Sequence, residues 1–103
     1  MPWFTVRSHY RFAGLHSGRD VYEERVVLFQ ALDAEGAIVQ AEREAAEYAE
    51  GIEPCEVLPL FQSFTLFDEP RHRAELYSLM RVSDLEPDPY LDHFFDTGDE
   101  RTS

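Results

Sequence analysis

Apolar and polar residues alternate along the first part of the chain with the period of two that is typical of a half-buried β-strand. Over residues 3–12, one face carries Phe4, Val6, Tyr10 and Phe12. The opposite face is mostly polar and carries histidine and arginine side chains. We therefore predict a strand over this range, with its apolar face packed against the rest of the protein.

A second strand is predicted over residues 21–32, VYEERVVLFQAL. Gly14 and Gly18 lie between the two strands and favour a hairpin loop over residues 13–20. The later half of the second strand is apolar on both faces, which predicts a central strand or one that is covered on both sides.

A long helix is predicted after the second strand. Asp33 is a favourable N-cap residue and Gly51 a natural stop, so the helix is expected to run to about Glu50. An apolar stripe repeats along it at spacings of three and four residues and is made of Ala34, Ile38, Ala41, Ala45 and Tyr48. Because this stripe is mostly alanine, we expect the helix to lie close to a sheet.

Two further strands are predicted after the helix, over residues 55–68 and 73–83. Pro59 lies inside the first of these and cannot donate to a ladder, so that stretch is predicted to be an edge, a bulge or a bend. A right-handed crossover through the helix makes the third strand parallel to the second, and the order 2-1-3-4 then makes every neighbouring pair antiparallel. The predicted fold is α+β, a four-stranded antiparallel sheet (ββαββ) with one long helix packed on one face.

A short helical turn is predicted in the C-terminal tail, where Asp88 is a cap residue and Pro89 suits the first helical position. The turn would bring residues four apart together on one side, Tyr90 with Phe94 and Leu91 with Phe95. We expect a ββαββ domain over residues 1–84, followed by an acidic tail over residues 85–103 that contains these aromatic side chains.

The face of the sheet opposite the helix also carries large apolar side chains and needs a cover. The candidates are the aromatic residues of the tail, a second copy of the chain, or a partner protein. We expect a homodimer, formed through the uncovered face or through strand edges.

The formal net charge of -12 is concentrated in two segments, with -7 on residues 33–56 and -6 on residues 84–103. Such a field argues against binding to nucleic acid or to an anionic membrane, and it favours a basic protein partner. No apolar run approaches the ~20 residues of a membrane span. With a single cysteine and no secretion-signal pattern at the N-terminus, a cytoplasmic protein is the expectation.

Catalytic signatures are sparse. The chain has no lysine, which excludes Schiff-base and phosphate-loop lysine chemistry, and its four histidines lack zinc-site spacing. We expect no metal and no cofactor. The leading hypothesis is a non-enzymatic interaction module for a basic protein, such as a toxin or nuclease that it restrains. The candidate interaction residues are Glu42, Glu44, Glu47, Glu50, Tyr90, Leu91, Phe94 and Phe95.

Two alternatives use other residues. A dimeric sensor of an anionic small molecule would use the candidate anion-binding residues Arg7, Arg11, Arg71 and Arg73. A small enzyme would instead require Asp20, Glu23, Glu24 and His9 to converge in a concave pocket.

Four segments together resemble an uncharacterised bacterial family, the domain-of-unknown-function family 4288: WFTVR, VYEERVVLFQA, EGAIVQAEREAAEY and AELYSLMR. The resemblance covers roughly residues 2–83 and rests on strand and helix patterns. Gly36 stands where such helices more typically carry an acidic residue, and the aromatic tail lies outside the pattern. The resemblance implies the same architecture and leaves the function open.

Overall fold

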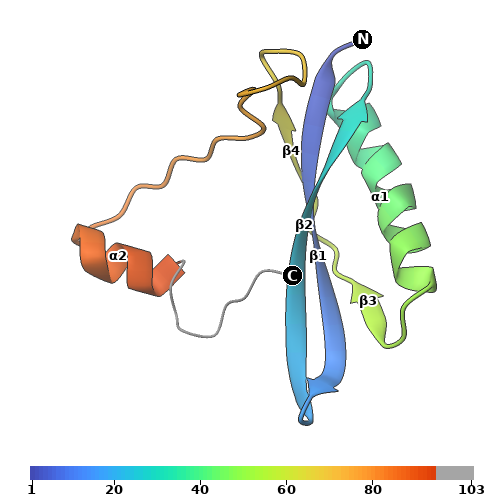
Figure 1. The fold of residues 1–103 in the computed structure, drawn as a ribbon, viewed down its shortest axis with the longest axis vertical. Helices are drawn as coiled ribbons and strands as arrows, with labels where there is room; N and C mark the ends of the chain where they lie inside the picture. The colour runs from blue at the N-terminus through green and yellow to red at the C-terminus, as the bar shows by residue number, and fades with distance from the viewer. Residues whose placement is uncertain (95–103) are drawn as a thin grey trace.

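The protein is an α+β domain in which an antiparallel four-stranded sheet packs against one long helix, with a second, short helix near the C-terminus (Figure 1). The computed structural model describes residues 1–94. The elements are β1 (Trp3–His16), β2 (Arg19–Gln30), α1 (Ala34–Glu50), β3 (Cys55–Val57), β4 (Gln62–Thr65) and α2 (Pro87–Phe94). This architecture confirms the predicted fold class.

β1 and β2 form a long hairpin that pairs from Trp3 opposite Gln30 to His16 opposite Arg19. Both strands are longer at the turn than predicted. The loop shrinks to Ser17 and Gly18, which have φ values of 53° and 80°. Two consecutive residues with positive φ make the kind of tight turn that follows the right-handed twist of the strands.

The predicted third strand is broken in two. β3 pairs antiparallel with β1 at Tyr10–Phe12, whereas β4 pairs with β1 at Phe4–Arg7. Pro59 lies in the gap between them, as expected for a residue that cannot donate to a ladder. Both short strands therefore occupy the same side of β1, and the sheet order is β2-β1-β3 with β4 beside β1.

β2 was expected to be central or doubly covered, and this prediction is wrong. Among the described residues β2 pairs with β1 alone, so it is an edge strand of the sheet. Val26 is 45% exposed and Leu28 is 38% exposed on the face opposite the helix. The apolar pattern correctly predicts a strand over these residues, but it does not predict which part of the protein covers their side chains.

Residues 73–83 do not form the predicted fourth strand. The part of this segment around Leu76 and Tyr77 lies over the open face of the sheet, the face opposite α1, where the hydroxyl of Thr5 donates to the Leu76 carbonyl at 2.7 Å. The ring of Tyr77 lies 4.7 Å from that of Phe64 in β4. Because Leu76 bonds to a side chain on the face of the sheet, this segment lies over the sheet rather than beside it, and it buries Thr5 to 2% exposure.

The core lies between α1 and the other face of the sheet. Asp33 caps the helix by accepting from the Gly36 backbone N–H at 2.8 Å, and the helix ends before Gly51, as predicted. The buried stripe is Ala37, Ala41 and Ala45. Ala34, predicted to belong to the stripe, is exposed, and Ala37 is buried in its place.

The tail forms the predicted helix, but α2 begins at Pro87, two residues before the expected start. The rings of Tyr90 and Phe94 lie 4.8 Å apart, as expected. The predicted partner of Leu91, Phe95, lies outside the described residues. α2 buries none of its residues and stands away from the sheet at the end of an extended stretch (Figure 1), so the described part of the tail does not cover the open face.

Candidate functional site

The two β1 arginines proposed as anion ligands lie on the open face of the sheet and are already paired. Arg7 donates to the Gln62 side-chain oxygen at 2.7 and 2.9 Å, and it lies 3.9 Å from a Glu24 oxygen. Arg11 pairs with Asp20 at 3.0 Å and with Glu56 at 3.2 Å. Hydrogen bonding to Asp20 raises the pKa of Arg11 above its ordinary value. An incoming anion would therefore compete with carboxylates already in place.

The other two proposed anion ligands lie after β4, in the turn that leads to the extended segment. Arg71 lies 3.6 Å from Asp68, three residues earlier. Arg73 is exposed and has a φ of 69°. The ion pairs and hydrogen bonds of the described residues do not join this turn to the β1 arginines, so the structure does not assemble the four into one site.

The proposed small-enzyme site is not assembled either. Glu23 faces α1, where it accepts from the hydroxyl of Tyr48. Its neighbour Glu24 lies on the opposite face, across from His9. Asp20 is bound to the Gly14 backbone N–H at 3.0 Å and to an arginine. The carboxylates of Glu23 and Asp20 are therefore engaged in contacts within the fold. The hydrogen bond from the Gly14 backbone N–H lowers the pKa of Asp20.

A polar cluster that the sequence did not reveal lies between the sheet and α1. At its centre Arg25 donates two hydrogen bonds to Glu44, at 2.9 and 3.0 Å, and a third to the Tyr10 hydroxyl at 3.0 Å. Its guanidinium also lies 3.7 Å from the centre of the Tyr48 ring. We call this group the Arg25 cluster; its members are Ser8, Tyr10, Glu23, Arg25, Glu44 and Tyr48.

One sequence signal points to the Arg25 cluster. Ser8 interrupts the apolar face of β1 two residues before Tyr10, and the two side chains are buried and hydrogen-bonded at 2.7 Å. A polar residue on the core face of a strand requires polar partners. Glu44 was predicted to be an exposed interaction residue, but it is half-buried and bound to Arg25, so its charge is neutralised within the protein.

The hydroxyl of Tyr48 should make the stability of the protein sensitive to alkaline pH. Its hydrogen bond to Glu23, at 2.7 Å, raises the pKa of Tyr48 from 10.0 to about 12. A raised folded-state pKa stabilises the fold below pH 10, and this contribution is lost as pH rises from 10 toward 12. We expect wild type to be more stable than Tyr48→Phe by about 2 kcal/mol at pH 9.

That difference should shrink steadily between pH 10 and 12, as measured by urea unfolding of both proteins. Glu23→Gln should remove most of this pH dependence, because the carboxylate is its main cause. A stability difference between wild type and Tyr48→Phe that stays constant over this range would contradict the assignment.

Cys55 is a poor nucleophile in this setting. Burial raises the pKa of its thiol above the ordinary value, and the charge of Glu23 raises it further. Among the described residues, no group of three or more His, Cys, Asp or Glu side chains is placed to hold a metal ion.

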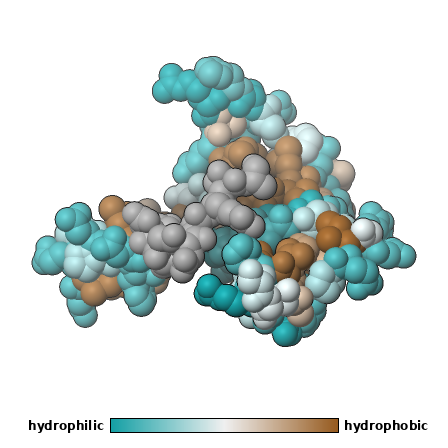
Figure 2. Space-filling model, turned by 60° about the horizontal axis from the view of Figure 1, so that its bottom comes forward, coloured by the Kyte–Doolittle hydropathy of each residue, from teal (hydrophilic) through white to brown (hydrophobic). Residues whose placement is uncertain are grey.

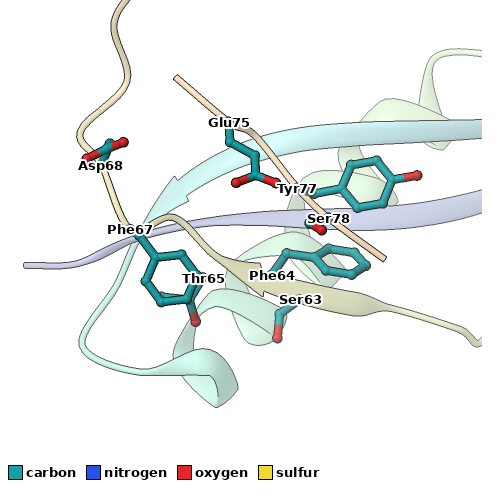
Figure 3. A pocket seen from close by; sticks show the side chains of 8 residues that line it. All are labelled: Ser63, Phe64, Thr65, Phe67, Asp68, Glu75, Tyr77 and Ser78. Atoms are coloured by element: carbon teal, nitrogen blue, oxygen red, sulfur yellow. The ribbon is translucent and has the colours of Figure 1, made fainter. Parts of the chain in front are cut away.

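A hollow of about 320 Å³ lies between β4 and the extended segment that crosses the open face. Figure 3 shows Phe64 and Tyr77 on one side of it, with Glu75 reaching over from the extended segment. The carboxylates of Glu75 and Asp68 and three hydroxyl side chains complete the lining. Phe67 also lines the hollow, and none of the lining side chains is cationic, so no positive charge in the lining attracts an anionic ligand.

The solvent side of α1 is acidic. Glu42, Glu47 and Glu50 are exposed there, as predicted for an interaction surface. The last turn of the helix contains no basic residue that would offset them. Four of the eight arginines in the described residues are paired with carboxylates: Arg7, Arg11, Arg25 and Arg71. Arg43 is exposed on α1 itself and offsets one of its three exposed glutamates.

Apolar side chains are open to the surface on the other side of the protein. They occur on β2, in the extended segment and on α2, and Figure 2 shows apolar surface both on the body and on the lobe at the left that holds α2. Met80 is 93% exposed and Val82 is 104% exposed. Within the described residues, no helix is long and apolar enough to span a membrane.

Comparison with protein-family models, with curated proteins and with solved structures gave no match. The resemblance to the uncharacterised bacterial family stays a prediction, and the function is argued from the surfaces described above.

Proposed function

We propose that the chain is a non-enzymatic protein-interaction module that docks a basic partner on the solvent side of α1. The observation that carries the proposal is the distribution of ion pairs. Four arginines are held by intramolecular carboxylate or amide partners, whereas Glu42, Glu47 and Glu50 stay exposed along one helix and outnumber its single exposed arginine, Arg43. The negative charge of α1 is therefore presented to solvent on a rigid element.

The helix is suited to this role because its other side is fixed. Ala37, Ala41 and Ala45 are nearly fully buried against the sheet, and Glu44 is bound to Arg25. An acidic surface of this kind mainly increases the rate at which a basic partner associates, and its effect weakens with salt. A toxin or nuclease that the module restrains is a partner with the required charge.

The dimeric anion sensor has less support. Its four arginines are divided between β1 and the turn after β4, and Arg7, Arg11 and Arg71 have intramolecular carboxylate partners. The hollow beside β4 is lined by two carboxylates, which would repel an anionic ligand.

The test compares two triple variants that remove the same charge. The first is Glu42→Gln with Glu47→Gln and Glu50→Gln. The matched control is Glu53→Gln with Glu69→Gln and Glu75→Gln, which are also exposed but lie off the helix. Affinity capture from the source cell extract at low salt should recover a basic protein with wild type and with the control.

The helix variant should slow association with the captured partner by about tenfold or more at low salt, with the difference shrinking as salt is added. Stopped-flow or surface-based kinetics measure this rate. Equal rates for the two triple variants, or no partner recovered with wild type, would overturn the proposal.

A further inference from the structure

Over residues 26–29, the outer edge of β2 lacks the features that usually protect an edge strand. Natural edges carry charges, prolines or bulges that prevent pairing with another chain. Residues 26–29 of β2 are Val-Val-Leu-Phe, four consecutive strand-forming apolar residues, and the pairing of β2 with β1 is regular along them. Such an edge is a ready template for one more strand.

A strand-like segment without strand partners is present in the same chain. Residues 79–83, Leu-Met-Arg-Val-Ser, which we call the arm, adopt no regular secondary structure. No backbone-to-backbone hydrogen bond joins the arm to another described residue. Leu79 is 43% exposed, while Met80 and Val82 contact almost nothing. Arg81 reaches α2, where it donates to the Tyr90 hydroxyl at 3.5 Å. The apolar side chains of Met80 and Val82, exposed on an extended backbone, indicate a surface whose partner lies outside the monomer.

The shape of the molecule supports this reading. The accessible surface is 7994 Å², against about 6,000 Å² for a compact monomer of this mass. The radius of gyration is 15.8 Å, against about 13 Å for a compact chain of this length. The arm runs from the open face toward α2 and away from the hairpin (Figure 1), so it does not follow the edge of its own β2.

We propose that in a dimer the arm of each copy adds as a strand to the outer edge of β2, beside residues 26–29, of the other copy. A strand of five residues is of ordinary length. The exchange is reciprocal, so two arms cover two edges and the assembly closes with two-fold symmetry. Charge favours these two segments as well, because together they carry only Arg81 in a chain of net charge -12. A second copy would therefore meet the least repulsive part of the protein.

The exchange of arms goes beyond the proposed function and involves the arm and β2 rather than the solvent side of α1. An experiment can therefore contradict one of the two proposals without contradicting the other. The test is solution mass by light scattering over a concentration series of the full chain. Wild type should have twice the mass of one chain. The double variant Met80→Glu with Val82→Glu should weaken dimerisation by about 100-fold or more, since residues 80 and 82 share one face of the added strand and each glutamate would lie beside the apolar side chains of the partner's β2. Both side chains are almost fully exposed in the monomer, so the fold should be unaffected.

Phe67→Glu is the matched control, because Phe67 is also 93% exposed but lies outside the arm. It should leave the dimer intact. A second measurement mixes two proteins that both carry Cys55→Ser, one with Leu28→Cys and the other with Met80→Cys. Under oxidation they should form a disulfide mainly between unlike copies.

Several results would overturn the proposal. A monomer at all concentrations would overturn it. In that monomer, an arm protected from hydrogen exchange would show that the arm covers its own sheet. An arm that exchanges freely would indicate that its binding partner is a protein other than a second copy of this chain. A dimer insensitive to the arm variant but broken by Phe67→Glu would place the interface elsewhere. Preferential linkage of like copies through position 28 would indicate face-to-face packing of the sheets.

Discussion

Replacing Tyr10 with alanine should lower the free energy of unfolding by about 4 kcal/mol. Tyr10 is fully buried, and its ring meets that of Tyr48 edge-on with centroids 5.0 Å apart. It forms one apolar cluster with Phe12 and Ala45, so truncation would empty the space between sheet and helix. Because a domain is stabilised by only about 5–15 kcal/mol, this loss is a large part of the total.

Urea unfolding at one fixed protein concentration measures the change in stability of the Tyr10→Ala variant, because any dimer makes stability depend on concentration. Tyr10→Phe keeps the ring and should cost about 1 kcal/mol, through the loss of hydrogen bonds to Ser8 and Arg25. Tyr22→Ala is the exposed control on the next strand and should cost less than about 0.5 kcal/mol. A cost below about 1.5 kcal/mol for Tyr10→Ala would mean that α1 does not pack on this ring.

The elements that the sequence predicted well are those whose signals are local. The limits of α1 follow from a capping aspartate, Asp33, and from Gly51, which act within one turn of the helix. The β1–β2 hairpin follows from alternation and from Gly18 in the turn. Pro59 marked the break between β3 and β4 because a missing N–H is a property of one residue. These features do not depend on distant parts of the chain.

The errors concern what covers each apolar face. Residues 26–29 and 76–82 are equally strand-like, but the first group lies on an edge strand and the second crosses a face or projects as the arm. The sequence pattern predicts that these side chains are buried against apolar groups. It does not predict whether those groups belong to the same chain. If the arm is exchanged, both errors have one cause, because the missing neighbour of each segment belongs to a second copy.

The candidate site was predicted in part. Exposure of Glu42, Glu47 and Glu50 follows from helical periodicity, which places them away from the alanine stripe. The role of Glu44 could not be read from the same pattern, since its partner, Arg25, lies on a strand nineteen residues earlier. Pairing between a helix and a sheet depends on their relative placement, and periodicity alone does not give it.

Replacing Arg25 with methionine should lower the free energy of unfolding by about 2 to 3 kcal/mol. The side chain of Arg25 is 22% exposed and that of Glu44 is 31% exposed. This places the pair between surface ion pairs, worth about 0–1 kcal/mol, and fully buried ones, whose disruption costs about 3–5 kcal/mol. Arg25 also lies over the Tyr48 ring at 3.7 Å and donates to Tyr10, so the expected loss exceeds that of a lone ion pair.

A matched control exists on the other face of the same hairpin. Arg11 pairs with two carboxylates, where Arg25 pairs with one, but its side chain is 39% exposed and it lies on the face of the sheet opposite α1. Arg11→Met should therefore cost clearly less than Arg25→Met in the same urea assay. Arg25→Lys should recover part of the loss at position 25, because an ammonium keeps the charge but cannot bond Glu44 through two parallel N–H groups.

A double-mutant cycle of Arg25→Met with Glu44→Gln separates the ion pair from the ring contacts. We expect a coupling energy of about 1 to 2 kcal/mol, with the rest of the Arg25 effect remaining when Glu44 is already changed. A coupling energy near zero would mean that Glu44 is open to solvent and available to a partner, and the acidic surface of α1 would then include it. A clear coupling keeps Glu44 within the fold and limits that surface to the three exposed glutamates, Glu42, Glu47 and Glu50.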